Sequence, residues 1–183
     1  ESEAVRMTGL VESLLTLTRM DETTKLERVK TNLVTLCIDA AKDASVADGK
    51  RKIVITDLAG NQLDDNATVD ANIDANSMRQ VLTNLLANAS RFSPEGAKIE
   101  IALDNQEWFD GKRILTLEVR DHGEGIPEQL RDKVFERFYR VDNSRNSETG
   151  GSGLGLAIVS SIVNRHEGKI VALETPGGGA TFR

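Results

Sequence analysis

The 183-residue chain is long enough for one domain of about 150 residues with an appendage. Its 39% hydrophobic and 28% charged residues are typical of globular proteins, and no stretch approaches the roughly 20 apolar residues of a membrane-spanning helix. The net charge of −6 disfavours nucleic-acid binding over the whole surface. The single cysteine, Cys37, excludes an intrachain disulfide and, with only two histidines, a Cys/His zinc cluster.

Residues 1–22 are expected to form one long amphipathic helix. Its apolar residues recur at a spacing of three and four: Met7, Leu10, Leu14 and Leu17. The polar segment from Asp21 to Thr24 interrupts this pattern, so the helix is expected to project from the rest and to pack against a partner in a bundle or dimer. We therefore expect two parts, a leader helix over 1–22 and a domain over 26–183.

Within the domain, hydrophobic periodicity and turn residues predict alternating strands and helices. The expected helices lie at Leu33 onwards, capped by Thr31 or Asn32, at Ser77–Phe92, briefly after Pro127, and at Leu154–His166. The expected strands are Leu26–Lys30, Lys52–Thr56, Thr68–Ile73, a hairpin of Lys98–Leu103 and Ile114–Val119 with Trp108 in its loop, Lys169–Leu173 and Ala180–Arg183. This irregular order favours an α/β (α+β) two-layer sandwich, a mixed sheet with helices on one face.

The helix over Ser77–Phe92 has one polar face. Its polar residues are Ser77, Gln80, Asn84, Asn88 and Arg91, and its apolar residues are Val81, Leu82, Leu85, Leu86 and Ala89. Asparagine is a poor residue for a helix interior, and its amide oxygen suits Mg²⁺ beside phosphates. The spacing alone leaves open a ligand-binding face or a solvated face.

Three further segments combine glycine or aromatic residues with polar ones. The segment from Asp121 to Pro127 follows a predicted strand, and its glycines would allow a flat ligand to lie close to the backbone. The alternative interpretation is an Asx turn, in which the glycines serve only the backbone conformation. The segment from Gly150 to Leu156 lies at the start of a predicted apolar helix, where free backbone N–H groups would be able to bind phosphate. The alternative interpretation of these glycines is a flexible linker. Phe135 to Arg140 concentrates aromatic residues, which favours a small satellite core over ligand stacking.

Taken in chain order, these segments resemble the ATP-binding domain of sensor histidine kinases, over about Val29 to Arg183. The matching motifs are an N box (Asn84 to Phe92), a first glycine box (Asp121 to Gly125), an F box (Phe135 to Tyr139), a second glycine box (Gly151 to Leu156) and a closing segment (Gly177 to Phe182). The family's fold, shared with type II topoisomerases, mismatch-repair ATPases and a heat-shock chaperone, agrees with the predicted sandwich.

The resemblance implies roles for individual residues. Asn88 would coordinate Mg²⁺, Asn84 and Arg91 would contact the phosphates of ATP, and Phe92 would lie against the base. Asp121 would accept a hydrogen bond from the adenine amino group, and Arg140 would approach the terminal phosphate. The nucleotide site would be completed by Gly123, Gly125, Ile126, Tyr139, Gly153, Leu154, Gly155, Leu156 and Thr181.

The leader helix resembles the second helix of the family's dimerisation and phosphotransfer hairpin. Neither His122 nor His166 has the neighbours of the phosphoacceptor histidine, so we expect ATP binding without self-phosphorylation of the chain. The resemblance implies a homodimer, the hairpin helices and a response-regulator receiver domain as partners, and no nucleic acid. It also implies a membrane-anchored parent with this part in the cytoplasm, which suits a chain with one cysteine.

Other classes remain open at this point. One is an ATPase or chaperone clamp of the same superfamily, although those relatives carry a general-base glutamate where this chain has Asn84. Another is a serine kinase of the anti-sigma type, which the leader helix argues against. A purely structural bundle module is the non-enzyme alternative, and it predicts no nucleotide binding.

Overall fold

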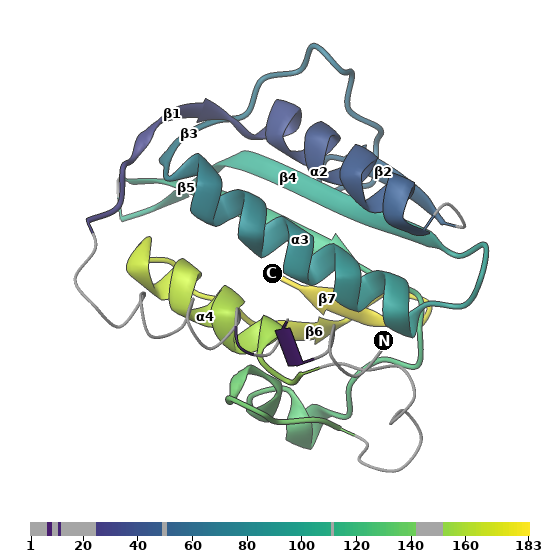
Figure 1. The fold of residues 1–183 in the computed structure, drawn as a ribbon. Coiled ribbons are helices and arrows are strands. Elements are labelled where there is room, and N and C mark those ends of the chain that lie inside the picture. Colours follow the sequence, from purple (N-terminus) through teal and green to yellow (C-terminus); the bar gives the residue numbers. More distant parts are fainter. Residues whose placement is uncertain (1–6, 9–10, 12–24, 49–50, 111, 142–151) are drawn as a thin grey trace.

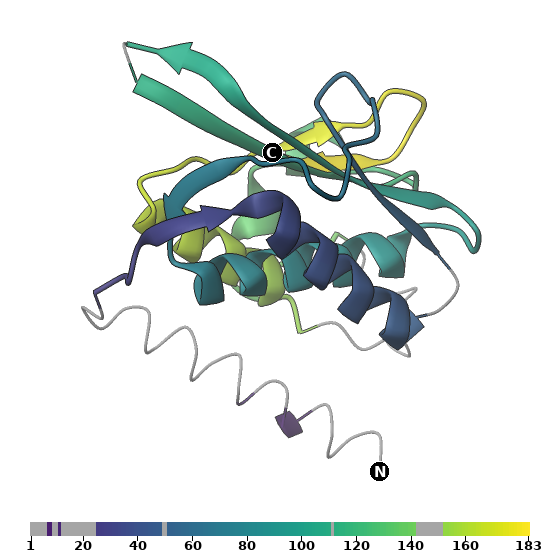
Figure 2. The same cartoon turned by 90° about the horizontal axis from the view of Figure 1, so that it is seen from above.

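The computed structural model describes residues 7–8, 11, 25–48, 51–110, 112–141 and 152–183. A five-stranded sheet has the order β2-β4-β5-β7-β6, and helices α2, α3 and α4 cover one of its faces (Figures 1 and 2). Strands β2 and β4 are parallel and the other neighbours are antiparallel. A separate antiparallel pair, β1-β3, lies at one edge of the helical layer. The predicted two-layer sandwich is confirmed.

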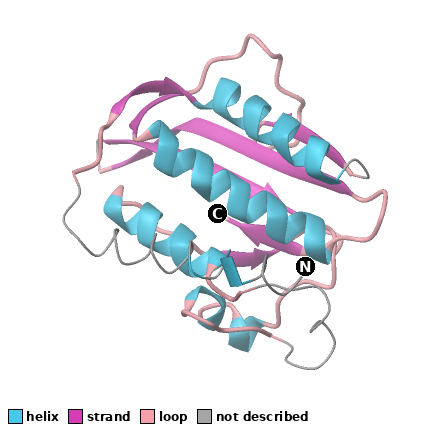
Figure 3. Ribbon diagram, in the orientation of Figure 1, coloured by secondary structure: helices cyan, strands magenta, loops and turns pink. Residues whose placement is uncertain are grey.

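Helices and strands are coloured separately in Figure 3. The helices are α2 (Leu33–Asp48), α3 (Ala75–Phe92) and α4 (Gly155–Arg165), with two 3-10 turns, η1 (Glu128–Leu130) and η2 (Lys133–Phe135). The strands are β1 (Val29–Asn32), β2 (Lys52–Thr56), β3 (Asp70–Ile73), β4 (Lys98–Phe109), β5 (Lys112–Arg120), β6 (Ala172–Glu174) and β7 (Ala180–Phe182).

An aliphatic core fills the space between sheet and helices. Alternate residues of β4, Ile99, Ile101 and Leu103, are buried, and they face the buried side of α3 with residues such as Leu82 and Leu85. Burial of such side chains contributes roughly 1.5–3 kcal/mol each. The predicted apolar face of α3 is confirmed, since Val81, Leu82, Leu85, Leu86 and Ala89 are all buried.

Side-chain caps set the starts of two helices. Asn32 Oδ1 accepts hydrogen bonds from Val34 N (3.1 Å) and Val69 N (3.2 Å), so Asn32 is the cap of α2. Helix α3 begins before the predicted Ser77, because Asp74 Oδ1 accepts a hydrogen bond from Ser77 N (2.9 Å) and caps the helix from its first turn.

Several predicted bounds were wrong. Strand β1 begins at Val29 instead of Leu26, and the β4-β5 hairpin is longer than predicted, so Trp108 lies within β4 and not in the loop. The segment after Pro127 forms 3-10 turns, in which Leu130 N donates to Pro127 O (2.9 Å), in place of a short α-helix. The predicted polar stretch Asp142–Gly153 lies largely outside the described residues.

The leader helix is described only at three positions. Met7, Thr8 and Val11 are helical, and Met7 and Val11 are exposed, whereas the other residues of 1–22 lie outside the described part of the chain. Among the residues that the structure describes, no helix combines the length and the apolarity needed to cross a membrane.

Candidate functional site

The polar face of α3 lies beside the first turn of α4. Asn84 and Asn88 are half-buried, and a Cβ placed on Gly155, the first residue of α4, would lie 3.5 Å from Asn84 Oδ1. Asn84 Nδ2 is buried, and no hydrogen-bond partner for it exists among the described residues. The N box and the second glycine box therefore share one surface, with an amide donor left for a ligand.

The backbone conformation at Gly153 shapes the approach to α4. Its φ is +70°, a region that favours glycine, and a Cβ there would lie 2.9 Å from the carbonyl carbon of Phe138. Phe138 N donates a hydrogen bond to Gly153 O (2.9 Å), and Leu154 is fully buried. This close contact joins the end of the F box to the second glycine box.

Asp121 lies in a buried position at the end of β5. The side chain is 2% exposed, and its Oδ1 accepts hydrogen bonds from Gly123 N and Ala180 N, each at 3.0 Å. Its own backbone N donates to Ala180 O (2.9 Å). Within the described part of the chain, no group donates a hydrogen bond to Asp121 Oδ2. One carboxylate oxygen is thus fixed by the backbone, and the other is left for a ligand.

Glycines allow three segments to meet around Asp121. A Cβ on Gly123 would overlap the carbonyl of Phe92 at the end of α3. A Cβ on Gly179, where φ is +113°, would overlap the carbonyl of Asp121, and one on Gly125 would lie 3.0 Å from Gly179 O. The first glycine box, the N-box helix and the turn before β7 therefore make backbone contacts that any side chain would prevent.

Two arginines add positive charge to the same region. Burial lowers the pKa of the Arg91 guanidinium, and the positive charge of Arg140 lowers it further, which shows that the two cations lie within electrostatic reach of each other. Arg91 also lies over the ring of Phe92, 5.4 Å from its centroid, and Phe92 is 47% exposed. Like charges held together in this way favour an anionic ligand.

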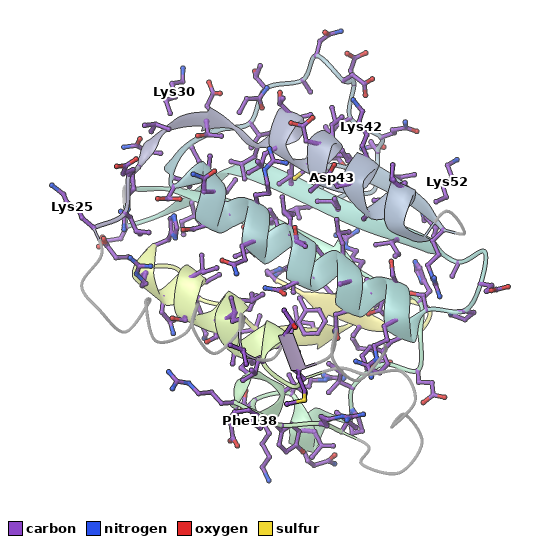
Figure 4. All side chains as sticks on the ribbon, viewed as in Figure 1. Lys25, Lys30, Lys42, Asp43, Lys52 and Phe138 are labelled. Atoms are coloured by element: carbon purple, nitrogen blue, oxygen red, sulfur yellow. The ribbon has the colours of Figure 1, made fainter. Side chains whose placement is uncertain are left out.

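The F box divides between core and surface. Phe135 packs edge-on against Phe182 of β7, with ring centroids 6.2 Å apart, and Tyr139 is partly buried against the core. Phe138 is 57% exposed at the periphery of the molecule, with a φ of +65° (Figure 4). The prediction of a separate satellite core was therefore wrong: Phe135 and Tyr139 pack against the main core, and Phe138 lies outside it.

The structure does not bring the side chain of Thr181 to Asp121. Thr181 pairs with Arg120 across β5 and β7, so the two residues share the sheet face opposite to the helices. Its hydroxyl lies 2.8 Å from that of Thr175. Ala180, one residue earlier, is the residue that faces Asp121. The sequence analysis assigned Thr181 to the site, one residue away from the residue that faces Asp121. The three glycines at 177–179, which precede β7, are the local signal for where this strand begins.

His122 holds the first glycine box against the outer sheet face. Its Nε2 lies 3.2 Å from Glu100 Oε2, and Glu100 Oε1 also pairs with Lys98 Nζ (2.8 Å). Burial raises the pKa of Glu100, but the hydrogen bonds from Lys98 and His122 outweigh it, so the pKa of this carboxyl lies below its ordinary value. His122 is therefore engaged by β4, away from the pocket at Asp121.

Comparisons with known proteins agree with this geometry. Residues 73–183 match the family described as histidine kinase-, DNA gyrase B-, and HSP90-like ATPase. The chain belongs to this family. The match covers every part of the site described above, from α3 to β7.

The chain is similar to curated sensor histidine kinases. It is 40% identical over 176 residues to a probable sensor histidine kinase, TcrY, of Mycobacterium tuberculosis, covering 96% of this chain and 34% of that protein. It is 43% identical over 111 residues to the sensor histidine kinase WalK of Bacillus subtilis, covering 60% of this chain and 18% of WalK. The chain thus spans about a third of one relative and less of the other. It is a histidine kinase-type ATP-binding domain.

Solved structures show the same fold. The catalytic domain of the histidine kinase ThkA matches with a TM-score of 0.66 and 25% identity, over 86% of this chain and 93% of that one. Full-length ShkA, in complex with AMPPNP, matches with a TM-score of 0.73 and 24% identity, over 96% of this chain and 34% of ShkA.

The donor set of the site tests whether a divalent cation fits. Among the described residues there is no group of three or more His, Cys, Asp or Glu side chains that could hold a metal ion. The polar face of α3 offers neutral amide groups instead, Asn84 and Asn88. Such a set suits Mg²⁺ that arrives with nucleotide phosphates, because Mg²⁺ takes most of its ligands from phosphates and water in sites of this kind.

Proposed function

We propose that this domain binds MgATP and presents its γ-phosphate to a histidine outside these 183 residues. The observation that carries the proposal is the buried Asp121, whose Oδ1 is fixed by two backbone amides while Oδ2 has no donor within the described residues. The membership of the histidine kinase-like ATPase family and the sensor kinase relatives support the same conclusion.

At the base end of the site, Asp121 Oδ2 would accept a hydrogen bond from the exocyclic amine of adenine. Guanine presents a carbonyl oxygen at that position, which a carboxylate repels. Gly125 and Ile126 would line the pocket, and Phe92, exposed at the end of α3, would lie against the base. Because Oδ1 is already fixed, the carboxylate needs no rearrangement to bind the base.

At the phosphate end, the charges and amides described above would hold the triphosphate. Arg91 and Arg140 would contact phosphate oxygens, and Asn84 Nδ2 would donate to the same group. The segment from Gly153 to Leu156, which leads into α4, would cap the phosphates with backbone N–H groups. Asn88 would hold Mg²⁺, which when bound neutralises the charge that develops on the phosphates.

The transfer step would break the bond between the γ-phosphorus and its bridging oxygen and form a phosphorus–nitrogen bond to an imidazole, with ADP leaving. Neither histidine of the chain is placed to receive the group. His122 contacts Glu100, and both ring nitrogens of His166 are engaged by Asp74 and Ile162. The phosphoryl group would then pass to an aspartate of a response regulator.

The leader residues fit the second helix of a dimerisation hairpin. Met7 and Val11 are four residues apart on a helix and both are exposed, which supports a partner helix and a homodimer in the whole protein. We propose a domain boundary between residues 22 and 26, and a membrane-anchored parent protein with this part in the cytoplasm.

Calorimetry tests the nucleotide proposal directly. We expect this chain to bind ATP with micromolar or tighter affinity in the presence of Mg²⁺, and GTP at least about tenfold more weakly, because the mismatch at Asp121 leaves a buried carboxylate without its donor. The absence of binding to any nucleotide would favour a purely structural module.

Two further measurements separate the kinase from its alternatives. Incubation of the purified chain with labelled ATP should yield no phosphohistidine and no rapid release of phosphate, since Asn84 replaces the general base of the hydrolytic relatives.

Asn88→Ala should weaken ATP binding about tenfold in Mg²⁺ and leave binding in EDTA nearly unchanged. Equal ATP affinities with and without Mg²⁺ in the unaltered chain would refute the role of Asn88.

A further inference from the structure

At the end of α3 and α4 away from Asn84 and Gly155, hydrogen bonds join three segments that are distant in sequence. These are the connector, residues 25–28, which precedes β1, the cap of α3, and the end of α4. We call this region the junction, and it consists of Glu27, Arg28, Asp74, Arg165, His166 and Glu167.

His166 bridges the two helices with both ring nitrogens. Its Nε2 accepts a hydrogen bond from Asp74 N (3.1 Å), and its Nδ1 lies 2.9 Å from Ile162 O. A backbone N–H always carries its proton, so Nε2 must lack one, whereas a carbonyl oxygen only accepts, so Nδ1 must carry one. The two contacts together require the neutral Nδ1–H tautomer of His166.

Asp74 uses both carboxylate oxygens for backbone amides. Oδ1 accepts from Ser77 N (2.9 Å) at the start of α3, and Oδ2 accepts from Glu27 N (3.0 Å) of the connector. The bond from Ser77 is the largest cause that lowers the pKa of Asp74, and the bond from Glu27 N lowers it further. An ionised carboxylate therefore lies beside an imidazole that the hydrogen bonds require to be neutral.

Arg28 ties the connector to the end of α4. Its guanidinium NH2 group donates to Arg165 O and to Glu167 Oε1, each at 3.0 Å. The hydrogen bond to Arg165 O satisfies one of the carbonyl oxygens that lack a partner within the helix at its C-terminus. The connector is thus bonded to the start of α3 through Glu27 and to the end of α4 through Arg28.

The geometry of the helices links the junction to the nucleotide site. Helix α4 runs from Gly155, beside Asn84, to His166, beside Asp74, so the two helices are antiparallel and meet at both points. The separation is about 10 residues on each helix, or roughly 15 Å. Because the first turn of α4 lies against the N-box face, we expect a shift of the other end of α4 at the junction to alter this contact.

We propose that His166 is a positioning residue for the nucleotide site, and that its protonation weakens nucleotide binding; this rests on the proposed function. A proton taken from solvent at Nε2 removes the acceptor for Asp74 N–H. The new N–H group then competes with Glu27 N for the Asp74 carboxylate, which loosens the connector and the cap of α3. Of the charged side chains that the hydrogen bonds place at the junction, Asp74 and Glu167 favour the added positive charge and Arg28 opposes it, while Glu27 and Arg165 take part through backbone atoms.

The tautomer tests the structural step without any substitution. In an imidazole ¹⁵N correlation spectrum of the chain near pH 8, we expect His166 in the Nδ1–H form, which is the less common tautomer of free histidine. As the pH falls, the amide signals of Ser77 and Glu27 should shift together with the His166 ring. A His166 found as the Nε2–H tautomer near pH 8 would overturn the proposal.

Nucleotide affinity tests the functional step. We expect the Kd for MgATP to rise between about pH 8 and about pH 5.5 by roughly fivefold more in the unaltered chain than in His166→Gln. Glutamine offers an acceptor oxygen near the position of Nε2 but does not titrate, and protonation of ATP itself is common to both proteins. His122→Gln removes the only other histidine of the chain and should retain the pH dependence.

The outcomes separate this inference from the function on which it rests. Equal pH dependence in the unaltered chain and His166→Gln, with ATP bound tightly near pH 8, would overturn the inference and leave the nucleotide site intact. A failure to bind ATP at any pH would instead overturn the proposed function. If His166→Gln does not fold, His122→Gln takes its place, because His166 is then the only histidine of the chain: a rise in the Kd for MgATP that does not follow the shifts of the His166 ring and of the Ser77 and Glu27 amides would overturn the inference.

Discussion

The α3–α4 helix pair is held at its two ends by different chemistry. At the junction, the polar groups of Asp74 and His166 are bonded within the chain, and both oxygens of Asp74 and both nitrogens of His166 are used. At the nucleotide end, Asn84 Nδ2 is buried without a hydrogen-bond partner among the described residues, and Asp121 Oδ2 accepts from none of them.

This difference distinguishes a structural end from a ligand-binding end. A buried polar atom without a partner costs about 1–3 kcal/mol, so a fold retains one where a ligand supplies the missing bond. The contacts at the nucleotide end are also made by glycines, such as Gly155 against Asn84 and Gly179 against Asp121, which bring segments together without filling the space between them.

The largest effect is expected for Gly179→Ala at the nucleotide end. A Cβ at this position would overlap the carbonyl of Asp121, and φ is +113°. Overlap and backbone strain together should lower the free energy of unfolding by about 3–5 kcal/mol, measured by urea denaturation. Gly177→Ala is the matched control, since its φ is +90° but no atom lies within 4 Å, and it should cost only about 1 kcal/mol. If the two variants lose equal amounts of stability, backbone strain explains the effect and the close contact with Asp121 does not.

Asp121→Asn should separate ligand binding from stability. The asparagine Oδ1 retains the hydrogen bonds from Gly123 N and Ala180 N, so the free energy of unfolding should change by less than about 1 kcal/mol. The amide NH2 that replaces Oδ2 cannot accept from adenine, and the Kd for ATP should rise about 10- to 100-fold in calorimetry.

Asp121→Ala serves as the comparison for that variant. It removes both oxygens and leaves the amides of Gly123 and Ala180 without their acceptor, so it should lose stability as well as affinity. If Asp121→Asn loses as much stability as Asp121→Ala, the carboxylate is structural and the contrast between the two ends of the helix pair fails.

Local patterns predicted the fold and placed the polar and apolar faces of α3 correctly. The periodicity of α3 placed Leu82 and Leu85 in the core and Asn84 and Asn88 on the other face, because helical spacing is a property of adjacent turns. Strand β2 was predicted residue for residue. The glycine boxes could be found because glycines mark points of close backbone contact, as at Gly123, and of positive φ, as at Gly125 and Gly153.

Contacts between distant segments could not be predicted in the same way. Arg28 contacts Arg165 across 137 residues and His166 contacts Asp74 across 92, and no periodicity relates such positions. The one local signal was Asp74 three residues before Ser77, a capping pattern, but the predicted helix start at Ser77 passed over it. Thr181 was misplaced because a register of one residue reverses the sheet face, and only the pairing of β5 with β7 determines it.

At the junction, Arg28→Gln should have a smaller effect than the changes at Asp121. It removes the bonds to Arg165 O and Glu167 Oε1 and should lower the free energy of unfolding by about 1 kcal/mol. Hydrogen exchange should show the loss of protection in the last turn of α4. Lys30→Gln removes the exposed ion pair with Asp70 on the adjacent strands and should cost less than about 0.5 kcal/mol. A larger effect at Lys30 would mean that Arg28 does not anchor α4.

The effect of Asp74→Asn is also small, and it depends on pH. Backbone hydrogen bonds, first that of Ser77, outweigh partial burial and hold the pKa of Asp74 below its ordinary value of 3.8, so the folded state favours the carboxylate. Its contribution to stability is therefore complete above about pH 5 and is lost as the pH falls through the lowered pKa. Asparagine caps helices about as well as aspartate, but its NH2 group cannot accept the bond from Glu27 N, so near pH 7 the two proteins should differ by about 1 kcal/mol. Urea unfolding between about pH 7 and about pH 2.5 should show this difference shrinking only below about pH 4. A difference that stays constant to the acid limit would mean that the charge of Asp74, as opposed to its hydrogen bonds, contributes nothing to the junction.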